Sequence, residues 1–114
     1  MEALFDANGE VYAWLHDSGK IYGLDGENLA FIDRNSVYDW AGAHVGWWAD
    51  GHIRDSKGAV FLFSADATNL GILKPMRSLR PLQPLRQLSP LKPLRGVRPL
   101  KPLKVPAWSR KIPF

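Results

Sequence analysis

Four copies of one short unit fill the first sixty-odd residues of the chain and restrict it to a repetitive fold. Each copy has a turn glycine, a short apolar pair before the glycine and an aromatic residue five positions after it. The fourth copy departs in its pair, which is Ile53 with Arg54. Spacings of 17, 16 and 16 residues between the glycines are typical of a supersecondary unit that recurs along the chain. The turn glycines and their aromatics are Gly9 with Trp14, Gly26 with Phe31, Gly42 with Trp47 and Gly58 with Phe63.

The pattern predicts that each unit is a β-hairpin. Asp6, Asp39 and Asp55 begin Asp-x-x-Gly turns, in which the carboxylate accepts backbone N–H groups and the glycine takes the positive φ that side chains resist. The second copy has Gly23 at the Asp position, so we expect an Asp-Gly turn at Asp25 to replace the longer turn there. Further turns at 17–19, 33–35 and 50–51 would close one unit and open the next.

Alternation after each turn predicts which residues of the hairpins share a face. Small residues, with Leu62 as the exception, lie between the aromatic positions, and they would let four hairpins approach closely around a central axis. The resulting fold class is all-β, with four hairpins in a pseudo-four-fold arrangement. The small face holds Ala13, Ala30, Gly46 and Leu62, and the expected core face holds Tyr12, Trp14, Leu29, Phe31, Val45, Trp47, Phe61 and Phe63.

A second pattern, with a period of three, runs from Met76 to Leu103. It fits neither a strand nor an α-helix but matches the three residues per turn of polyproline II, so we expect an extended rod. Proline usually precedes each aliphatic residue, and Lys or Arg follows it. The aliphatic face would present Leu79, Leu82, Leu85, Leu88, Leu91, Leu94, Val97, Leu100 and Leu103.

The basic face of this rod makes the chain strongly polarised. Residues 1–73, the expected head, carry a formal charge of −7, and residues 74–114, the expected tail, carry +11. A basic tail can bind nucleic acid or an anionic membrane surface. Phosphate binding needs no regular aliphatic face. We therefore favour packing of the tail on the chain's own head, a homo-oligomer or a protein partner over binding to nucleic acid or a membrane. The basic face holds Arg77, Arg80, Arg86, Lys92, Arg95, Arg98, Lys101 and Lys104.

The sequence offers no assembled catalytic or metal site. Without cysteine there is no thiolate nucleophile or zinc-thiolate site, and no serine has the context of a catalytic triad. His16, His44 and His52 match no metal-ligand spacing and are expected at the surface or in turns, so no metal or other cofactor is predicted. No signal peptide or membrane-spanning stretch is visible, which predicts a cytoplasmic protein.

Trp40 and Trp48 are the candidates for a small binding platform. The third unit carries more aromatics than its core face requires, and exposed indoles could stack on a sugar or a base. The alternative is that the leucines of the tail cover both tryptophans.

These patterns resemble the four-fold beta flower proteins. The resemblance is carried by LFDANGEVYAWL, VYDWAGAHVGWW and IRDSKGAVFLF, by the basic Pro-rich triplets, and by the closing Pro106-Ala107-Trp108-Ser109. It implies a pseudo-four-fold arrangement of hairpins and, because the family has no assigned activity, no residue-level site. We therefore expect a non-enzymatic structural or interaction module whose tail mediates self-assembly or docking, with binding of an anionic polymer as the alternative.

Overall fold

Eight short strands form the head, and each strand is only three to six residues long. The computed structural model of the chain describes residues 1–77 and 95–114. Among these residues, no helix is long and apolar enough to cross a membrane. The strands are β1 (Glu2–Phe5), β2 (Val11–Leu15), β3 (Lys20–Tyr22), β4 (Asn28–Asp33), β5 (Ser36–Asp39), β6 (His44–Ala49), β7 (His52–Arg54) and β8 (Val60–Phe63).

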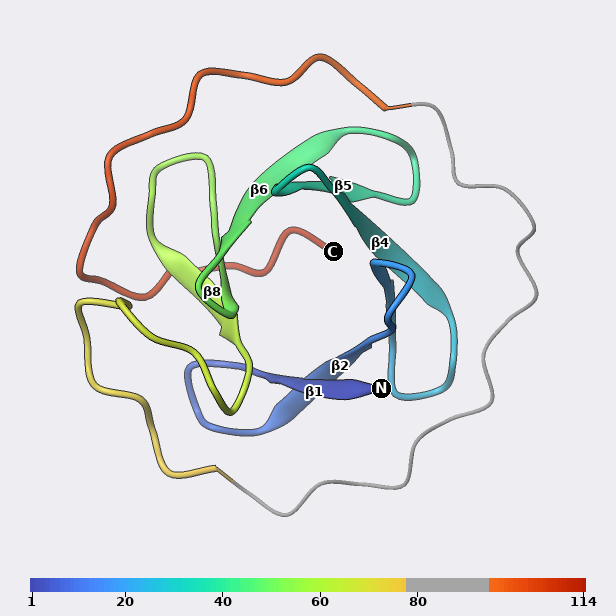
Figure 1. The fold of residues 1–114 in the computed structure, drawn as a ribbon. Coiled ribbons are helices and arrows are strands. Elements are labelled where there is room, and N and C mark those ends of the chain that lie inside the picture. The colour runs from blue at the N-terminus through green and yellow to red at the C-terminus, as the bar shows by residue number, and fades with distance from the viewer. Residues whose placement is uncertain (78–94) are drawn as a thin grey trace.

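The strands pair antiparallel in sequence order, and β1 closes on β8 through Phe5 and Phe63, which makes a closed barrel (Figure 1). The pseudo-four-fold symmetry extends to single hydrogen bonds. The amide of Ile32 donates to the carbonyl of Gly19, and its equivalents sixteen and thirty-two residues later, Trp48 and Ser64, donate to Asn35 and Gly51. The predicted all-β fold with four hairpins is confirmed.

A β-bulge recurs in every hairpin and decides which side chains enter the barrel. The register shifts after Leu4, Ile21, Val37 and Ile53, in each case beside the turn of the unit. A bulge puts two neighbouring residues opposite one partner, so strict alternation of faces is lost there. The prediction that all eight large residues share one face is therefore wrong. The inward-facing members of that set are Tyr12, Leu29, Val45 and Phe61, which pack in the axial core.

The small residues do lie at the axis, as predicted. Ala13, Ala30 and Leu62 are fully buried in a cluster to which strands from all four hairpins contribute. At Gly46 a Cβ atom would lie 2.6 Å from the Arg54 carbonyl oxygen, so the backbones approach too closely there for any side chain. The other aromatics are also buried, but they lie on the outer side of the barrel wall. These outer aromatics are Trp14, Phe31, Trp47 and Phe63.

The Asp-x-x-Gly turns form as predicted in three of the units. In the first, Asp6 Oδ1 accepts from the amides of Asn8 and Glu10, at 2.9 and 3.1 Å. The same pair of bonds recurs at Asp39 and at Asp55.

The prediction of an Asp-Gly turn in the second unit is wrong, because this unit forms the same longer turn as the other three. Gly23 accepts from the Gly26 amide and donates to the Glu27 carbonyl, as the aspartates do in the other units. The Glu27 carboxylate supplies the missing acceptor, since its Oε1 lies 3.3 Å from the Asp25 amide. It occupies the place of an aspartate side chain, because a Cβ atom on Gly23 would lie 1.7 Å from that oxygen.

We expect Gly23→Asp and Glu27→Ala to compensate each other. Each change alone should lower the free energy of unfolding by about 1 kcal/mol, the first by crowding two carboxylates and the second by removing an acceptor. The double variant has one carboxylate in the turn again and should unfold like the wild type, a coupling of about 1 to 2 kcal/mol. Urea denaturation of the four proteins measures the coupling, and additive losses would contradict the exchange of roles.

Candidate functional site

The tail before residue 106, in its described parts, lies outside the hairpins and meets their turns (Figure 1). At the first turn, the Met76 carbonyl oxygen lies 2.0 Å from where a Cβ of Gly9 would be. At the third, the amide of Gly96 donates to the Gly42 carbonyl, and at the fourth the amide of Val105 donates to the Gly58 carbonyl at 3.0 Å. The tail thus approaches the head at the turn glycine of each of these three units.

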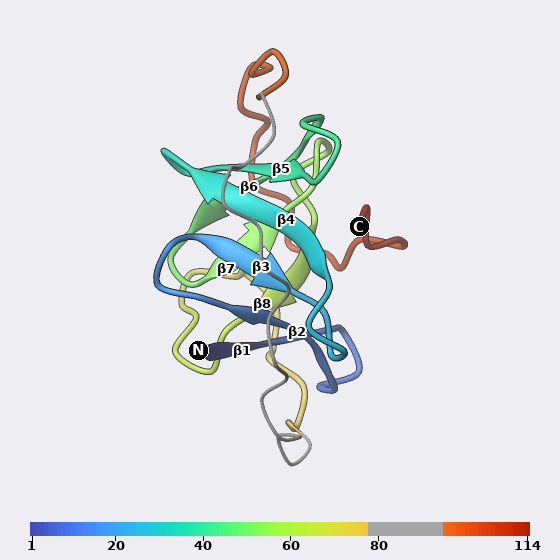
Figure 2. The ribbon, with the colours of Figure 1, turned by 90° about the vertical axis from the view of Figure 1, so that its right-hand side faces the viewer.

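The last residues turn inward and cover one end of the barrel. Val60 forms a parallel bridge with Trp108, donating to Ala107 at 3.0 Å and accepting from Ser109 at 2.7 Å. Phe114 then lies edge-on to Phe61 with ring centroids 5.7 Å apart. The side view shows the two termini on opposite sides of the barrel (Figure 2). Phe114 therefore covers the end of the barrel that lies away from the N-terminus.

Arg54 holds the tail to the head, and sequence reasoning noticed it only as an irregular pair. It is 6% exposed. Its Nη1 donates to the carbonyls of Gly58 and Val105 at 2.7 and 2.8 Å, and its Nη2 to those of Asn69 and Leu70 at 3.2 and 2.9 Å. One guanidinium therefore joins the fourth turn, the segment after β8 and the tail. The signal that could have found it is a cation at a position where the other units have Phe5, Tyr22 and Tyr38.

His52 completes this cluster. The expectation that it lies at the surface or in a turn is wrong. It begins β7 and is fully buried. Its Nε2 accepts from Arg54 Nε at 3.1 Å, so that nitrogen carries no proton. Burial, and then the Arg54 cation, lower the pKa of His52 below its usual range. A neutral imidazole beside a buried guanidinium is the arrangement that like-charge repulsion favours.

The other two histidines are only partly buried. His16 lies in a turn, where its Nδ1 is 2.8 Å from the Ser18 hydroxyl. His44 lies on β6 between Tyr38 and Trp47, and burial lowers its pKa, with a further contribution from Arg98. Within residues 1–77 and 95–114, no three His, Asp or Glu side chains come together as metal ligands would.

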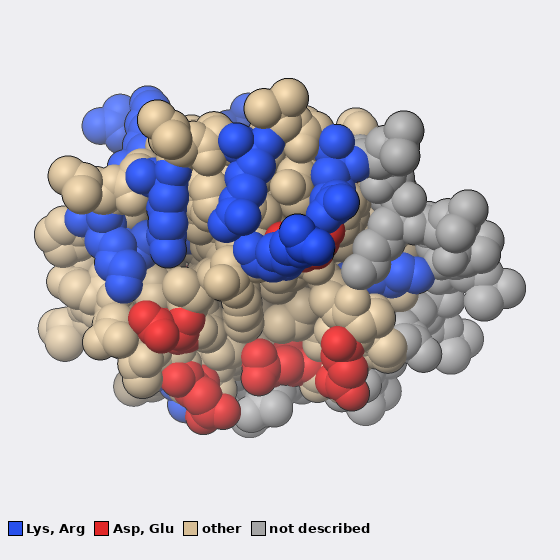
Figure 3. Space-filling view, turned by 45° about the horizontal axis from the view of Figure 1, so that its top comes forward, with Lys and Arg blue, Asp and Glu red and all other residues tan. Residues whose placement is uncertain are grey.

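Several basic side chains of the tail lie against the head. The Arg77 guanidinium lies 5.8 Å from the Phe5 ring centroid, and that of Arg98 lies 5.0 Å from the ring of Trp47. Arg95 pairs with Asp33, and Lys104 Nζ lies 3.8 Å from an Asp50 carboxylate oxygen. Figure 3 shows Lys and Arg side chains set side by side across one face, with Asp and Glu gathered beneath them.

The described aliphatic residues of the period-three pattern point to solvent. We call this set of residues the outer row. Nothing in it covers a tryptophan, so for these residues the expectation that tail leucines shield Trp40 and Trp48 is wrong. The guanidinium groups of Arg77 and Arg98 lie over the rings of Phe5 and Trp47, and the aliphatic side chains of the same segments face away from the head. The outer row consists of Met76 (93% exposed), Val97 (92%), Leu100 (96%) and Leu103 (88%).

Most of the predicted tail residues lie outside the described part of the chain. The polyproline-type conformation stays a prediction. The predicted aliphatic residues concerned are Leu79, Leu82, Leu85, Leu88, Leu91 and Leu94. The predicted basic residues concerned are Arg80, Arg86 and Lys92.

The two tryptophans of the predicted platform lie on different sides of the barrel wall. Trp40 is on the outside, edge-on to Phe31 with centroids 5.8 Å apart. Trp48 belongs to the axial core and donates its backbone amide to Asn35 at 2.9 Å. The structure therefore does not bring them together, but it does place Trp48 at a hollow.

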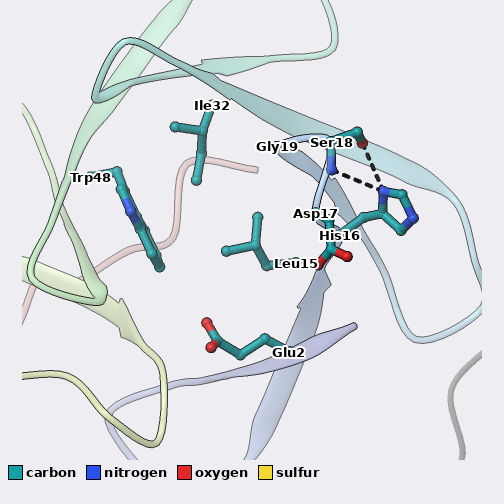
Figure 4. Close-up of a pocket in the computed structure, with 8 residues that line it drawn as sticks. All are labelled: Glu2, Leu15, His16, Asp17, Ser18, Gly19, Ile32 and Trp48. Carbon is teal, nitrogen blue, oxygen red and sulfur yellow. Dashed lines mark hydrogen bonds between the residues drawn. The ribbon is translucent and has the colours of Figure 1, made fainter.

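This axial hollow opens at the end of the barrel opposite Phe114, beside the turns that join one unit to the next. Leu15, Ile32 and Trp48, which are equivalent residues of three units, form its apolar lining. Glu2 and the turn at 16–19 form the rim. Figure 4 shows the Trp48 indole with one face toward Leu15 and Ile32, and the Glu2 carboxylate reaching toward the same space. Such a site can hold an apolar group close to a negative charge.

Comparison with known proteins agrees with this architecture. The family described as 4-fold beta flower protein matches residues 2–112. No curated protein and no solved structure matches the chain. With four hairpins closed into one barrel and a family match over almost the whole chain, this protein belongs to the 4-fold beta flower family.

Proposed function

We propose that the protein is a non-enzymatic interaction module in which the head supports the tail and the outer row binds a second copy of the chain. The observation that carries the proposal is the exposure of the outer row, 88 to 96% for its four described residues. Val97, Leu100 and Leu103 recur at every third residue of one described segment, and a run of almost fully exposed aliphatic side chains supports an interaction surface.

Charge supports a second copy as the partner. The tail contributes only positive charge and the head is acidic, so two copies offer complementary surfaces without any further component. Within one chain, Arg95 with Asp33 and Lys104 with Asp50 already show that tail cations and head carboxylates match in position. These cations are partly neutralised by the head, which makes them weaker ligands for the phosphates of a nucleic acid.

The test is the native mass of the full chain and of a variant in which Val97, Leu100 and Leu103 are all serine. Each exposed residue that becomes buried contributes roughly 1.5 to 3 kcal/mol, so the triple variant should weaken association by about 100-fold or more. Its melting temperature at low concentration should stay near that of the wild type, because these side chains make no large contact with the head. A charge control, Lys101→Gln with Arg110→Gln, should keep most of the association, because exposed charges contribute less to it than apolar side chains that become buried.

Sedimentation across a range of concentrations, with and without a generic RNA, separates the outcomes. Association that is lost in the serine variant and kept in the charge control supports the proposal. A wild type that stays monomeric, or RNA binding that survives in the serine variant and is lost in the charge control, would overturn it in favour of binding to an anionic polymer.

A further inference from the structure

We propose that the axial hollow binds a small organic cation, in which an ammonium group is carried on an apolar chain. This site is separate from the outer row and at a different place on the molecule. The two ends of the barrel axis differ. One end of the barrel axis is covered by the chain's own Phe114, which packs against Phe61 and Tyr12. The other end remains hollow in the described structure and is lined by Leu15, Ile32 and Trp48.

The repeat makes Trp48 the distinctive residue of the lining. Its equivalents are Leu15, Ile32 and Ser64, none of which is aromatic. Ser64 is buried and adjoins the turn glycine Gly51, so the fourth unit adds no large side chain to the hollow. An indole face therefore stands on one side of the space and two aliphatic side chains stand opposite it (Figure 4).

The charges around the hollow select the sign of the ligand. Glu2 and Asp17 contribute carboxylates, and the described lining includes no Lys or Arg. The His16 ring is held away by Ser18 and lies edge-on to Tyr22. A cation over the face of an indole gains from the ring quadrupole, and a nearby carboxylate adds to that attraction. An ammonium group can meet Trp48 and Glu2 while its apolar chain covers Leu15 and Ile32.

Three probes with the same apolar body test the charge selection: hexylammonium, hexan-1-ol and hexanoate. Their dissociation constants can be measured by titration, with indole N–H signals in a nitrogen-labelled sample locating the site. We expect hexylammonium to bind about tenfold more tightly than hexanoate, with hexanol between them. The Trp48 signal should shift most. Glu2→Gln, a change at an exposed position, should reduce the ratio of ammonium to carboxylate affinity to about threefold or less.

Trp48→Leu and Trp40→Leu form a matched pair of controls. The first should weaken hexylammonium binding about fivefold or more, because leucine retains the apolar lining but has no π face. The second should have no effect, because Trp40 lies on the outside of the barrel. Equal affinity for the three probes, shifts confined to residues away from Trp48, or an unchanged ratio in Glu2→Gln would overturn the assignment. The Glu2 variant keeps the test informative if Trp48→Leu fails to fold.

Discussion

Replacing Arg54 with methionine is expected to lower the free energy of unfolding by on the order of 3 kcal/mol or more, a large fraction of the stability of so small a barrel. Methionine fills much of the same volume but donates no hydrogen bond. The four carbonyls of Gly58, Val105, Asn69 and Leu70 would lose their charged donor together. A buried carbonyl without a hydrogen-bond donor lowers the stability of the folded state. Some of the segments that carry these carbonyls would have to move apart so that water could reach them.

The effect should also appear locally, because the four carbonyls belong to three separate segments. Thermolysin should cut the methionine variant near residues 69–70 and 105 much sooner than it cuts the wild type, under conditions in which the barrel remains folded. Arg54→Lys keeps the charge but has a single nitrogen in place of the planar fork, so it should recover less than half of the loss. Arg34→Met, at an exposed turn, is the control for removing an arginine. Equal melting of Arg54→Met and Arg34→Met would contradict the role given to Arg54.

Arg54 also illustrates why part of this structure could not be predicted from the sequence. The repeat placed it correctly, at a position where other units have an aromatic residue. Apart from His52, however, its partners are main-chain carbonyls up to 51 residues away, and a main-chain carbonyl leaves no mark in a sequence. A residue that breaks a repeat can be recognised, but its partners depend on how distant segments come together.

The bulges set a second limit. Glycine spacing and Asp-x-x-Gly turns were enough to predict four hairpins around an axis, and the small residues Ala13, Ala30 and Gly46 indicated what lies at that axis. Strict alternation then gave Tyr12 and Trp14 the same face, whereas the bulge separates them. One extra residue in a strand changes every later assignment of faces.

In the tail, too, the sequence predicted a repeating pattern but not its orientation. A period of three predicts which residues share a face, but it does not say which face meets the head. The answer came from contacts such as Arg98 on Trp47, which put the cations inward and left the outer row exposed. The aromatic platform failed for a related reason, since Trp40 and Trp48 lie on opposite sides of the barrel wall.

Gly58→Ala is expected to lower the free energy of unfolding by about 2 to 4 kcal/mol and to loosen the tail. The residue has a φ of +87°, which any L side chain resists. A Cβ atom there would also lie 2.0 Å from the Leu103 carbonyl oxygen, a backbone atom that moves only if the tail moves. Displacing this segment would break the hydrogen bond from the Val105 amide to Gly58 and weaken the bond from Arg54 to the Val105 carbonyl.

Two further variants distinguish the causes of this loss. Gly58→Asn tolerates positive φ better than alanine but has the same Cβ atom, so we expect it to recover only about 1 kcal/mol, because contact with the tail is the larger cost. Asp55→Asn keeps the acceptor for the amides of Lys57 and Ala59 and should change stability by less than about 0.5 kcal/mol. Chemical denaturation gives the free energies, and chymotrypsin cleavage near Trp108 reports release of the tail. Full recovery in Gly58→Asn would assign the loss to backbone strain alone, and the close approach of Leu103 would then have no part in holding the tail.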